Sequence, residues 1–186
     1  MNNLNMFCLS LEPKHYNFIK ELGYLPVGLG EKNFGKEWLS DRSGINISKK
    51  NKYYGEYTYH YWFWKNHLDQ IEDGWIGFCQ YRKFWSLTEY KNEDINFNNL
   101  KSKVLREIPK EFDSYETILG TPFFVNQSKP MKFIKHGFKI FIKNPLLFFS
   151  EKKRNVNFHF DLMHGENNLN RAIDLLDEKN KDDFRK

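Results

Sequence analysis

The stretch GWIGFCQYRKFW, residues 74–85, decides the fold that we expect for this chain. Residues 75–79 are apolar, and a short apolar run with polar flanks predicts a buried strand. The polar residues that follow directly are Gln80, Tyr81, Arg82 and Lys83. In open α/β sheets, ligands bind beyond the carboxyl ends of the strands. We therefore expect a central strand whose end carries the chemistry.

Strand and helix patterns alternate along the rest of the chain. Residues 5–11 read as a buried strand, and residues 12–22 carry apolar side chains at helical spacing. The later elements that we expect are a short strand within 23–35, a loop over 36–51, helices over 97–108, 130–149 and 169–180, and a strand over 117–124 in which Pro122 marks an edge or an early end. Interleaved strands and helices predict an α/β fold.

The stretch YYGEYTYHYWFWKN, residues 53–66, predicts a helix with two faces. Apolar side chains at three- and four-residue steps predict its core stripe. The members of this stripe are Tyr54, Tyr57, Tyr61, Trp64 and Leu68. Glu56 and His60 lie four residues apart and off the stripe, so we expect them to face a ligand.

Length, charge and cysteine content limit the classes of protein to consider. A chain of 186 residues predicts one domain, and its formal charge of +5 favours an anionic partner: a phosphorylated metabolite, a nucleic acid or a membrane surface. No nucleic-acid-binding motif accompanies the charge, so we expect no nucleic acid. Cys8 and Cys79 show no CxxC spacing, which argues against a metal site or a disulfide framework. With neither a signal-peptide pattern nor an apolar run of about 18 residues, a cytoplasmic location is expected.

Two segments offer candidate chemistry. Arg82 and Lys83 supply donors for a diphosphate, and the alternative is that they only end a strand in solvent. The segment HFDLMHG brings His159, Asp161 and His164 within six positions, which suits acid–base work, metal binding or plain hydrogen bonding. Of these, deprotonation of a hydroxyl group by Asp161 is favoured over a metal site, because two histidines without a close third ligand are a weak metal signal.

The expected helix over residues 130–149 is basic and apolar at once. Its apolar stripe comprises Met131, Ile134, Phe138 and Phe141, and its basic stripe comprises Lys132, Lys135, Lys139 and Lys143. Lysines beside an apolar stripe can rest on an anionic lipid surface, so peripheral contact with the inner face of a membrane is one interpretation. The other is an ordinary helix that buries the stripe and solvates its lysines.

Two motifs in order carry a family resemblance. The segment GINISKKNKYYGEYTYHYWFWKN, residues 44–66, followed by WIGFCQYRKFW, residues 75–85, resembles a bacterial family from capsular and exopolysaccharide gene clusters, labelled a domain of unknown function. That family is grouped with GT-A glycosyltransferases, and some members are described as galactofuranosyltransferases. The positions that match its motifs are Asp41, Gly44, Asn46, Ser48, Tyr54, Glu56, Trp62, Trp64, Asn66, Tyr81, Arg82 and Phe84.

Three departures from the family pattern matter. Arg42 stands where many members have Asn, Lys83 replaces a second Arg, and Gln80 replaces a His. Lysine keeps the charge but loses bidentate geometry, whereas the amide of Gln80 can neither titrate nor bind a metal as an imidazole does. If the family His were catalytic, this chain would be impaired or altered.

The resemblance implies a GT-A-like, Rossmann-like glycosyltransferase domain over residues 1–186, with a mixed sheet flanked by helices, which could be a shortened version of the family domain. It implies a nucleotide-sugar donor and a glycan or lipid-linked acceptor. The donor-binding residues that we expect are Asp41, Asn46, Glu56, Tyr81, Arg82 and Lys83, and the candidate catalytic residues are Asp161, His164 and Glu56. GT-A enzymes usually hold a metal through D-x-D, which is absent here, so no cofactor is expected, with a divalent metal ion as the alternative. The alternative is a non-catalytic glycan- or nucleotide-binding module.

Overall fold

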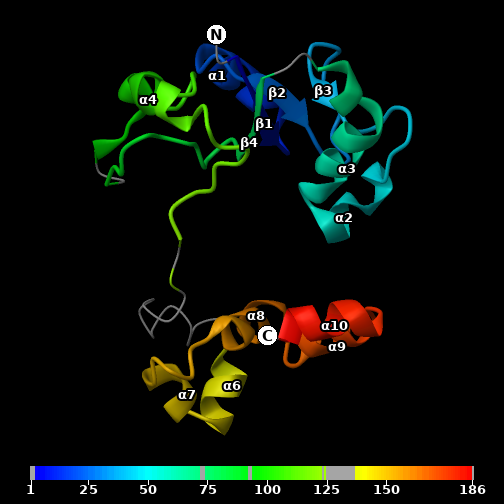
Figure 1. The fold of residues 1–186 in the computed structure, drawn as a ribbon, viewed down its shortest axis with the longest axis vertical. Coiled ribbons are helices and arrows are strands. Elements are labelled where there is room, and N and C mark those ends of the chain that lie inside the picture. The colour runs from blue at the N-terminus through cyan, green and yellow to red at the C-terminus, as the bar shows by residue number, and fades with distance from the viewer. Residues whose placement is uncertain (1–2, 72–73, 92–93, 123, 125–136, 186) are drawn as a thin grey trace. The chain divides into compact units, whose positions relative to one another are not determined.

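The computed structural model describes residues 3–71, 74–91, 94–122, 124 and 137–185 (Figure 1). Internal contacts separate the chain into two compact units, which we call the N-terminal unit, Met1–Gly120, and the C-terminal unit, Thr121–Lys186. Each unit is described by itself. The expectation of one glycosyltransferase-like domain over the whole chain stays a prediction.

A parallel sheet forms the centre of the N-terminal unit. Its strands are β1 (Leu4–Ser10), β2 (Leu25–Gly28), β3 (Leu39–Ser40) and β4 (Trp75–Gln80). They lie in the order β3-β2-β1-β4, and every pairing is parallel. We expected a mixed sheet, but the segments that connect these strands carry the chain back across the sheet, so each strand runs in the same direction.

Helical segments occupy two of the connections between the strands and also follow β4. In the N-terminal unit these are η1 (Pro13–His15), α1 (Tyr16–Glu21), η2 (Ser48–Lys50), α2 (Asn51–Tyr54), α3 (Tyr57–Asn66), η3 (Leu68–Gln70), α4 (Phe97–Lys103) and η5 (Lys110–Phe112). The strand–helix opening of the chain is confirmed. The helix expected over 97–108 ends at Lys103, because Val104 takes extended backbone with φ −81° and ψ 148°.

The alternation of β1 sends its side chains into two core clusters, one on each face of the sheet. Met6 and Cys8 pack with Ile19 of α1 on one face, where partly buried Leu100 of α4 joins them. On the other face, Phe7 and Leu9 pack with the residues of α3. Figure 1 shows α4 and α3 on opposite sides of the sheet.

The predicted strand at residues 75–79 is confirmed as β4, but its position and its neighbour differ from our expectation. Among the described strands β4 lies at an edge of the sheet rather than at its centre. The described residues of the segment 117–124 form no strand, so β4 has no outer neighbour there. Pro122 has no backbone donor, and Leu119 is 83% exposed, so this segment lacks both the hydrogen bond and the burial that hold a strand.

The aromatic stretch is helical, but its predicted core stripe is wrong. Tyr57 and Trp64 are 64% and 58% exposed, and Tyr54 and Leu68 are exposed as well. The buried residues of α3 are Thr58, Tyr59, Trp62 and Phe63. Gly55, at φ +53°, ends α2, and α3 starts again at Tyr57, so the helical phase of Tyr54 does not continue into α3.

Short helices make up the described part of the C-terminal unit. They are α6 (Phe138–Lys143), α7 (Leu146–Phe149), α8 (Val156–His164), α9 (Asn168–Asp174) and α10 (Glu178–Arg185). Phe148 and Leu162 form their buried cluster, against which Phe141 packs. Gly137 is needed beside it, because a Cβ at this position would overlap Leu162. The predicted burial of Phe138 is wrong, since it is 58% exposed, and Met131 and Ile134 lie outside the described residues.

Within the described part of the chain, no helix has both the length and the apolar character that crossing a membrane requires.

Candidate functional site

The carboxyl ends of the parallel strands meet at one edge of the sheet, and two cavities lie there. The larger, which we call the tyrosine cavity, has a volume of about 660 Å³. Its polar and aromatic lining consists of Ser10, Asn51, Lys52, Tyr53, Tyr54, Glu56, Tyr57, Gln80, Tyr81 and Arg82. The smaller, which we call the histidine cavity, has a volume of about 390 Å³ and is lined by Glu56, His60, Gln80, Lys83, Phe84 and Trp85 among others.

Glu56 and Gln80 belong to both cavities. Glu56 lies directly before α3, and Gln80 is the last residue of β4. The side-chain amide of Gln80 donates a hydrogen bond to Glu56 Oε2, which joins the helix to the strand end. This pair therefore lies at the boundary between the two cavities, and the carboxylate of Glu56 contributes an oxygen atom to that boundary.

Arg82 and Lys83 line different cavities. Arg82 lines the tyrosine cavity and Lys83 lines the histidine cavity. The cause is a tight turn after β4: Lys83 N–H donates to the Gln80 carbonyl at 3.0 Å, and Gln80 N–H donates to the Lys83 carbonyl at 3.3 Å. The structure therefore does not bring these neighbouring cations together around one ligand group. In the tyrosine cavity the second cation is Lys52, which the sequence did not single out.

A stacked pair of rings borders the tyrosine cavity. The Tyr81 ring lies 4.2 Å from the His15 ring, centroid to centroid, at 18° between the planes. His15 Nδ1 lies 2.8 Å from Ser10 Oγ at the end of β1, and the Arg82 guanidinium lies 5.7 Å from the Tyr81 ring centre. Burial, with the charge of Lys14, lowers the pKa of His15. Applying the strand-end rule to β1 would have pointed to Ser10, but no sequence signal links His15 to Tyr81.

His60 gives the histidine cavity a titratable ring. It lies one helical turn beyond Glu56 on α3, and its centroid is 4.6 Å from that of Phe78. Burial lowers the pKa of His60, and the nearby Glu56 carboxylate opposes this change. The balance favours a neutral imidazole near neutral pH.

Asp41 lines neither of the two cavities. It follows β3 directly and is fully buried. Neither carboxylate oxygen has a hydrogen-bond partner among the described residues, and the same holds for the Tyr59 hydroxyl. The pKa of Tyr59 is raised, first by burial and second by the charge of Asp41. The assignment of Asp41 to donor binding therefore has no support from its position.

Asn46 and its neighbours hold a loop against α3. Asn46 Oδ1 accepts from Ser48 Oγ at 2.8 Å, and Asn46 Nδ2 donates to the Gly44 carbonyl at 3.0 Å. Asn66 accepts from Ile45 N–H at 2.9 Å and donates to the Ile45 carbonyl at 2.8 Å.

Trp62 and Gly44 also hold this loop against α3. Trp62 Nε1 donates to the Ser43 carbonyl at 2.8 Å. Gly44 has φ +56°, and a Cβ on it would overlap the Asn66 side chain, so the loop needs glycine there. The loop at residues 43–48 and helix α3 thus bind each other, which gives these residues of the first motif a structural role.

Asp161 and His164 lie on α8 in the C-terminal unit. Asp161 Oδ1 is buried and has no hydrogen-bond partner within the described ranges, whereas His164 is exposed, with its ring 4.5 Å from that of Phe160. Glu56 belongs to the N-terminal unit. Asp161 and His164 therefore share one helix, and Glu56 belongs to the other unit.

The basic stripe is described only in part. Lys132 and Lys135 lie outside the described residues, and Lys139 falls within α6. Lys143 is exposed and lies 3.4 Å from Glu166 Oε2. In the ranges that the structure describes, no group of three or more His, Cys, Asp or Glu residues is arranged to hold a metal ion.

An all-parallel sheet with polar side chains at its carboxyl edge defines an α/β protein with a Rossmann-like arrangement of strands and helices. The chain belongs to the family described as Domain of unknown function (DUF4422), whose model matches residues 9–185. Neither the curated proteins nor the solved structures include a match to this chain.

Proposed function

We propose that the protein is a glycosyltransferase of GT-A type that takes its sugar from a nucleotide-sugar donor, for bacterial surface polysaccharide synthesis. The observation that carries this proposal is the convergence of Glu56, Tyr81 and Arg82 around one cavity at the carboxyl edge of a parallel sheet. A cavity of about 660 Å³ lies within the usual range for small-ligand sites. Cations for a diphosphate and rings for a base occur together there.

The tyrosine cavity would bind the donor. Arg82 and Lys52 neutralise the diphosphate, and Arg82 does so with the planar donors that suit phosphate oxygens. Tyr53 is 80% exposed beside them, which leaves its ring free to stack on a base. A positive clamp of this kind stabilises the negative charge that develops on the leaving diphosphate, so the proposed enzyme needs no metal ion.

Transfer forms a bond between an acceptor oxygen and the anomeric carbon while the bond from that carbon to the diphosphate breaks. The acceptor loses its proton to a base, and the nucleoside diphosphate leaves with the bonding electrons. Glu56 would bind a sugar hydroxyl at the boundary of the two cavities. Asp161 and His164 remain our candidates for the base.

Donor binding can be tested with Arg82→Ala. Loss of a charge-assisted hydrogen bond is worth about 1.5–3 kcal/mol, so nucleotide-sugar affinity should fall by about 10- to 100-fold. Calorimetry with a panel of nucleotide sugars measures this. Arg106→Ala is the matched control, because Arg106 is an exposed arginine of the same unit that is not among the cavity residues. Equal losses in both variants would contradict the assignment.

Two further measurements address the chemistry. Sugar transfer that persists in excess chelator supports the metal-independent clamp. If the chelator abolishes transfer and manganese or magnesium restores it, the clamp proposal is wrong. Asp161→Asn should abolish turnover with little effect on donor affinity if Asp161 is the base, and His164→Asn tests the alternative in the same way.

A non-catalytic nucleotide- or glycan-binding module is the second candidate. It is favoured by the hydrogen bond from the Gln80 amide to Glu56, because this carboxylate is engaged by a group that does not titrate. Donor hydrolysis or transfer separates the two functions. Binding of a nucleotide sugar without either reaction would identify the module.

Peripheral attachment to the inner face of a membrane, where a lipid-linked acceptor would be presented, is part of the proposal. Exposed Phe138, Ile142, Leu146 and Phe149 on α6 and α7 support it, with exposed Lys143 nearby. Flotation with anionic liposomes tests it. Changing Lys132, Lys135, Lys139 and Lys143 to Glu should abolish flotation, and retention of binding would contradict the idea.

A further inference from the structure

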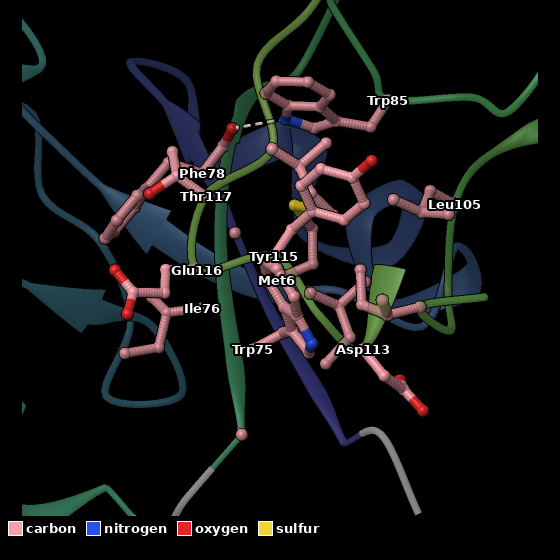
Figure 2. Close-up of a pocket in the computed structure, with 15 residues that line it drawn as sticks. Met6, Trp75, Ile76, Phe78, Trp85, Leu105, Asp113, Tyr115, Glu116 and Thr117 are labelled. Carbon is pink, nitrogen blue, oxygen red and sulfur yellow. Dashed lines mark hydrogen bonds between the residues drawn. The ribbon is translucent and has the colours of Figure 1, made fainter. Parts of the chain in front are cut away.

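A third cavity lies along the outer edge of β4, and we call it the edge cleft (Figure 2). Its volume is about 870 Å³. One part of its wall is β4 itself from Trp75 to Phe78, and another is the segment from Tyr115 to Ile118. It follows the length of the strand, whereas the tyrosine and histidine cavities lie at the carboxyl edge of the sheet. Phe78 and Trp85 line both the edge cleft and the histidine cavity, so these two adjoin, whereas the edge cleft shares no lining residue with the tyrosine cavity.

Aromatic rings from three segments line the edge cleft. They belong to Trp75, Phe78, Trp85 and Tyr115. Figure 2 shows Trp85, Tyr115 and Trp75 following one another down the view. Tyr115 is 59% exposed, and Trp75 and Trp85 are partly exposed, so ring surface remains available to a ligand.

The charge of the edge cleft differs from that of the whole protein. Its charged lining residues are Asp113 and Glu116, and among the residues that the structure describes no lysine, arginine or histidine lines it. The chain as a whole carries a formal charge of +5. An acidic wall repels phosphates and uronates, whereas carboxylate oxygens accept hydrogen bonds from hydroxyl groups. The edge cleft therefore favours a neutral, hydroxyl-rich ligand.

The backbone of β4 argues against an added peptide strand. Trp85 Nε1 donates to the Phe78 carbonyl at 2.8 Å and so occupies an acceptor on the outer edge of the strand. Trp85 is itself fixed, since its carbonyl accepts from Leu105 N–H at 2.8 Å. Strand addition needs a continuous row of free edge groups, and the indole interrupts that row.

We propose that the edge cleft binds a neutral carbohydrate chain. The rings of Trp75, Trp85 and Tyr115 offer apolar surfaces that match the C–H faces of sugar rings. Glu116 accepts hydrogen bonds from the hydroxyl groups at the sugar edges. This inference goes beyond the proposed function, because it assigns a second binding site that needs neither donor nor turnover.

The test is a binding measurement on the full chain without any nucleotide sugar. Maltohexaose, cellohexaose and chitohexaose serve as neutral probes, and hexagalacturonate serves as the anionic comparison. Saturation-transfer NMR detects contact, and fluorescence titration follows Trp75 and Trp85. We expect at least one neutral probe to bind, and hexagalacturonate to bind more weakly. Tyr115→Ala should weaken neutral binding by about tenfold, and Glu116→Gln by a smaller factor, since removal of a contacting ring costs more than loss of one exposed hydrogen bond.

Trp64→Ala is the matched control, because Trp64 is an exposed aromatic residue of the same unit outside the edge cleft. It should leave the affinity unchanged. The proposal is overturned if no neutral probe binds, if hexagalacturonate binds more tightly, or if Tyr115→Ala and Glu116→Gln leave binding intact. Competition of an extended peptide for the bound probe would also overturn it, by assigning the edge cleft to a protein partner. Arg82→Ala should not affect this binding, so failure of the donor site and failure of the edge cleft are distinguishable.

Discussion

The two units of the chain differ in the size of the buried core that supports their candidate residues. In the N-terminal unit, separate clusters cover both faces of the sheet. Glu56 lies directly before α3, and Tyr81 and Arg82 follow β4, and both of these elements pack into the clusters. In the described part of the C-terminal unit, Phe148 and Leu162 form one small cluster among short helices. Asp161 is the neighbour of Leu162 in that cluster.

The difference bears on how precisely each unit can hold a ligand. Groups that bind or catalyse are held best when their side chains stand on rigid, well-packed elements. The N-terminal unit meets that condition at the carboxyl edge of its sheet. A small core supplies little stability of its own, so we expect the C-terminal unit to open more easily.

Removing one buried ring from each unit should lower the free energy of unfolding by the largest amount. The Phe7 ring lies 5.0 Å from that of Phe63 and 5.7 Å from that of Phe78, and Phe148 lies 5.2 Å from Phe158. Replacing a buried Phe by Ala costs about 3–5 kcal/mol. Hydrogen exchange read by mass spectrometry should show Phe148→Ala opening the C-terminal unit alone and Phe7→Ala opening the N-terminal unit. If Phe148→Ala exposed the sheet equally, the two units would be one cooperative body, and the comparison would fail.

Asn66→Ala should lower the stability of the N-terminal unit alone, and by less than the removal of a buried ring does. The side chain holds both backbone groups of Ile45 and also donates to the Trp62 carbonyl at 2.8 Å. Leaving such partners unsatisfied costs about 1–3 kcal/mol. Urea unfolding measures the loss, and hydrogen exchange should rise first in residues 43–48.

Gln70→Ala is the control for that variant, since Gln70 is exposed and its side chain makes one hydrogen bond, to the Asn66 carbonyl. It should change the free energy of unfolding by less than Asn66→Ala does. Equal effects would mean that the hydrogen bonds between the loop and α3 contribute little to the free energy of unfolding. Donor affinity that survives Asn66→Ala would show that the motif stabilises the fold and does not contact the ligand.

Where a local pattern determines structure, the sequence predicted it well. The apolar run in residues 5–11 predicted β1, and the apolar-to-polar change at Gln80 located the end of β4. The spacing of Glu56 and His60 also placed both side chains at the histidine cavity. Periodicity selected the wrong face of α3, because aromatic residues occupy both of its faces and spacing alone did not distinguish the predicted stripe from the buried Tyr59, Trp62 and Phe63.

Features that depend on distant contacts were not predictable in this way. His15 reaches Tyr81 only because β1 and β4 pair in register, and Asp41 is buried because the two-residue strand β3 pairs with β2. The separation of Arg82 from Lys83 follows from a turn whose hydrogen bonds no residue pattern announces. Pairing and turn geometry, rather than residue type, decided these positions.

The smallest effect that we predict is a pH dependence from His60. Burial holds its pKa below the ordinary value of 6.5, so below that pH the unfolded chain binds a proton that the folded imidazole does not. Stability of the N-terminal unit should therefore fall as the pH drops below about 6.5 and recover as it rises. Glu56 and Lys83 line the same cavity, and Glu56 opposes the shift. The urea midpoint is measured above and below that pH. The difference between the two midpoints should be smaller in His60→Gln than in the unsubstituted protein, and larger in Glu56→Gln. An unchanged difference in His60→Gln would assign the pH dependence to other groups.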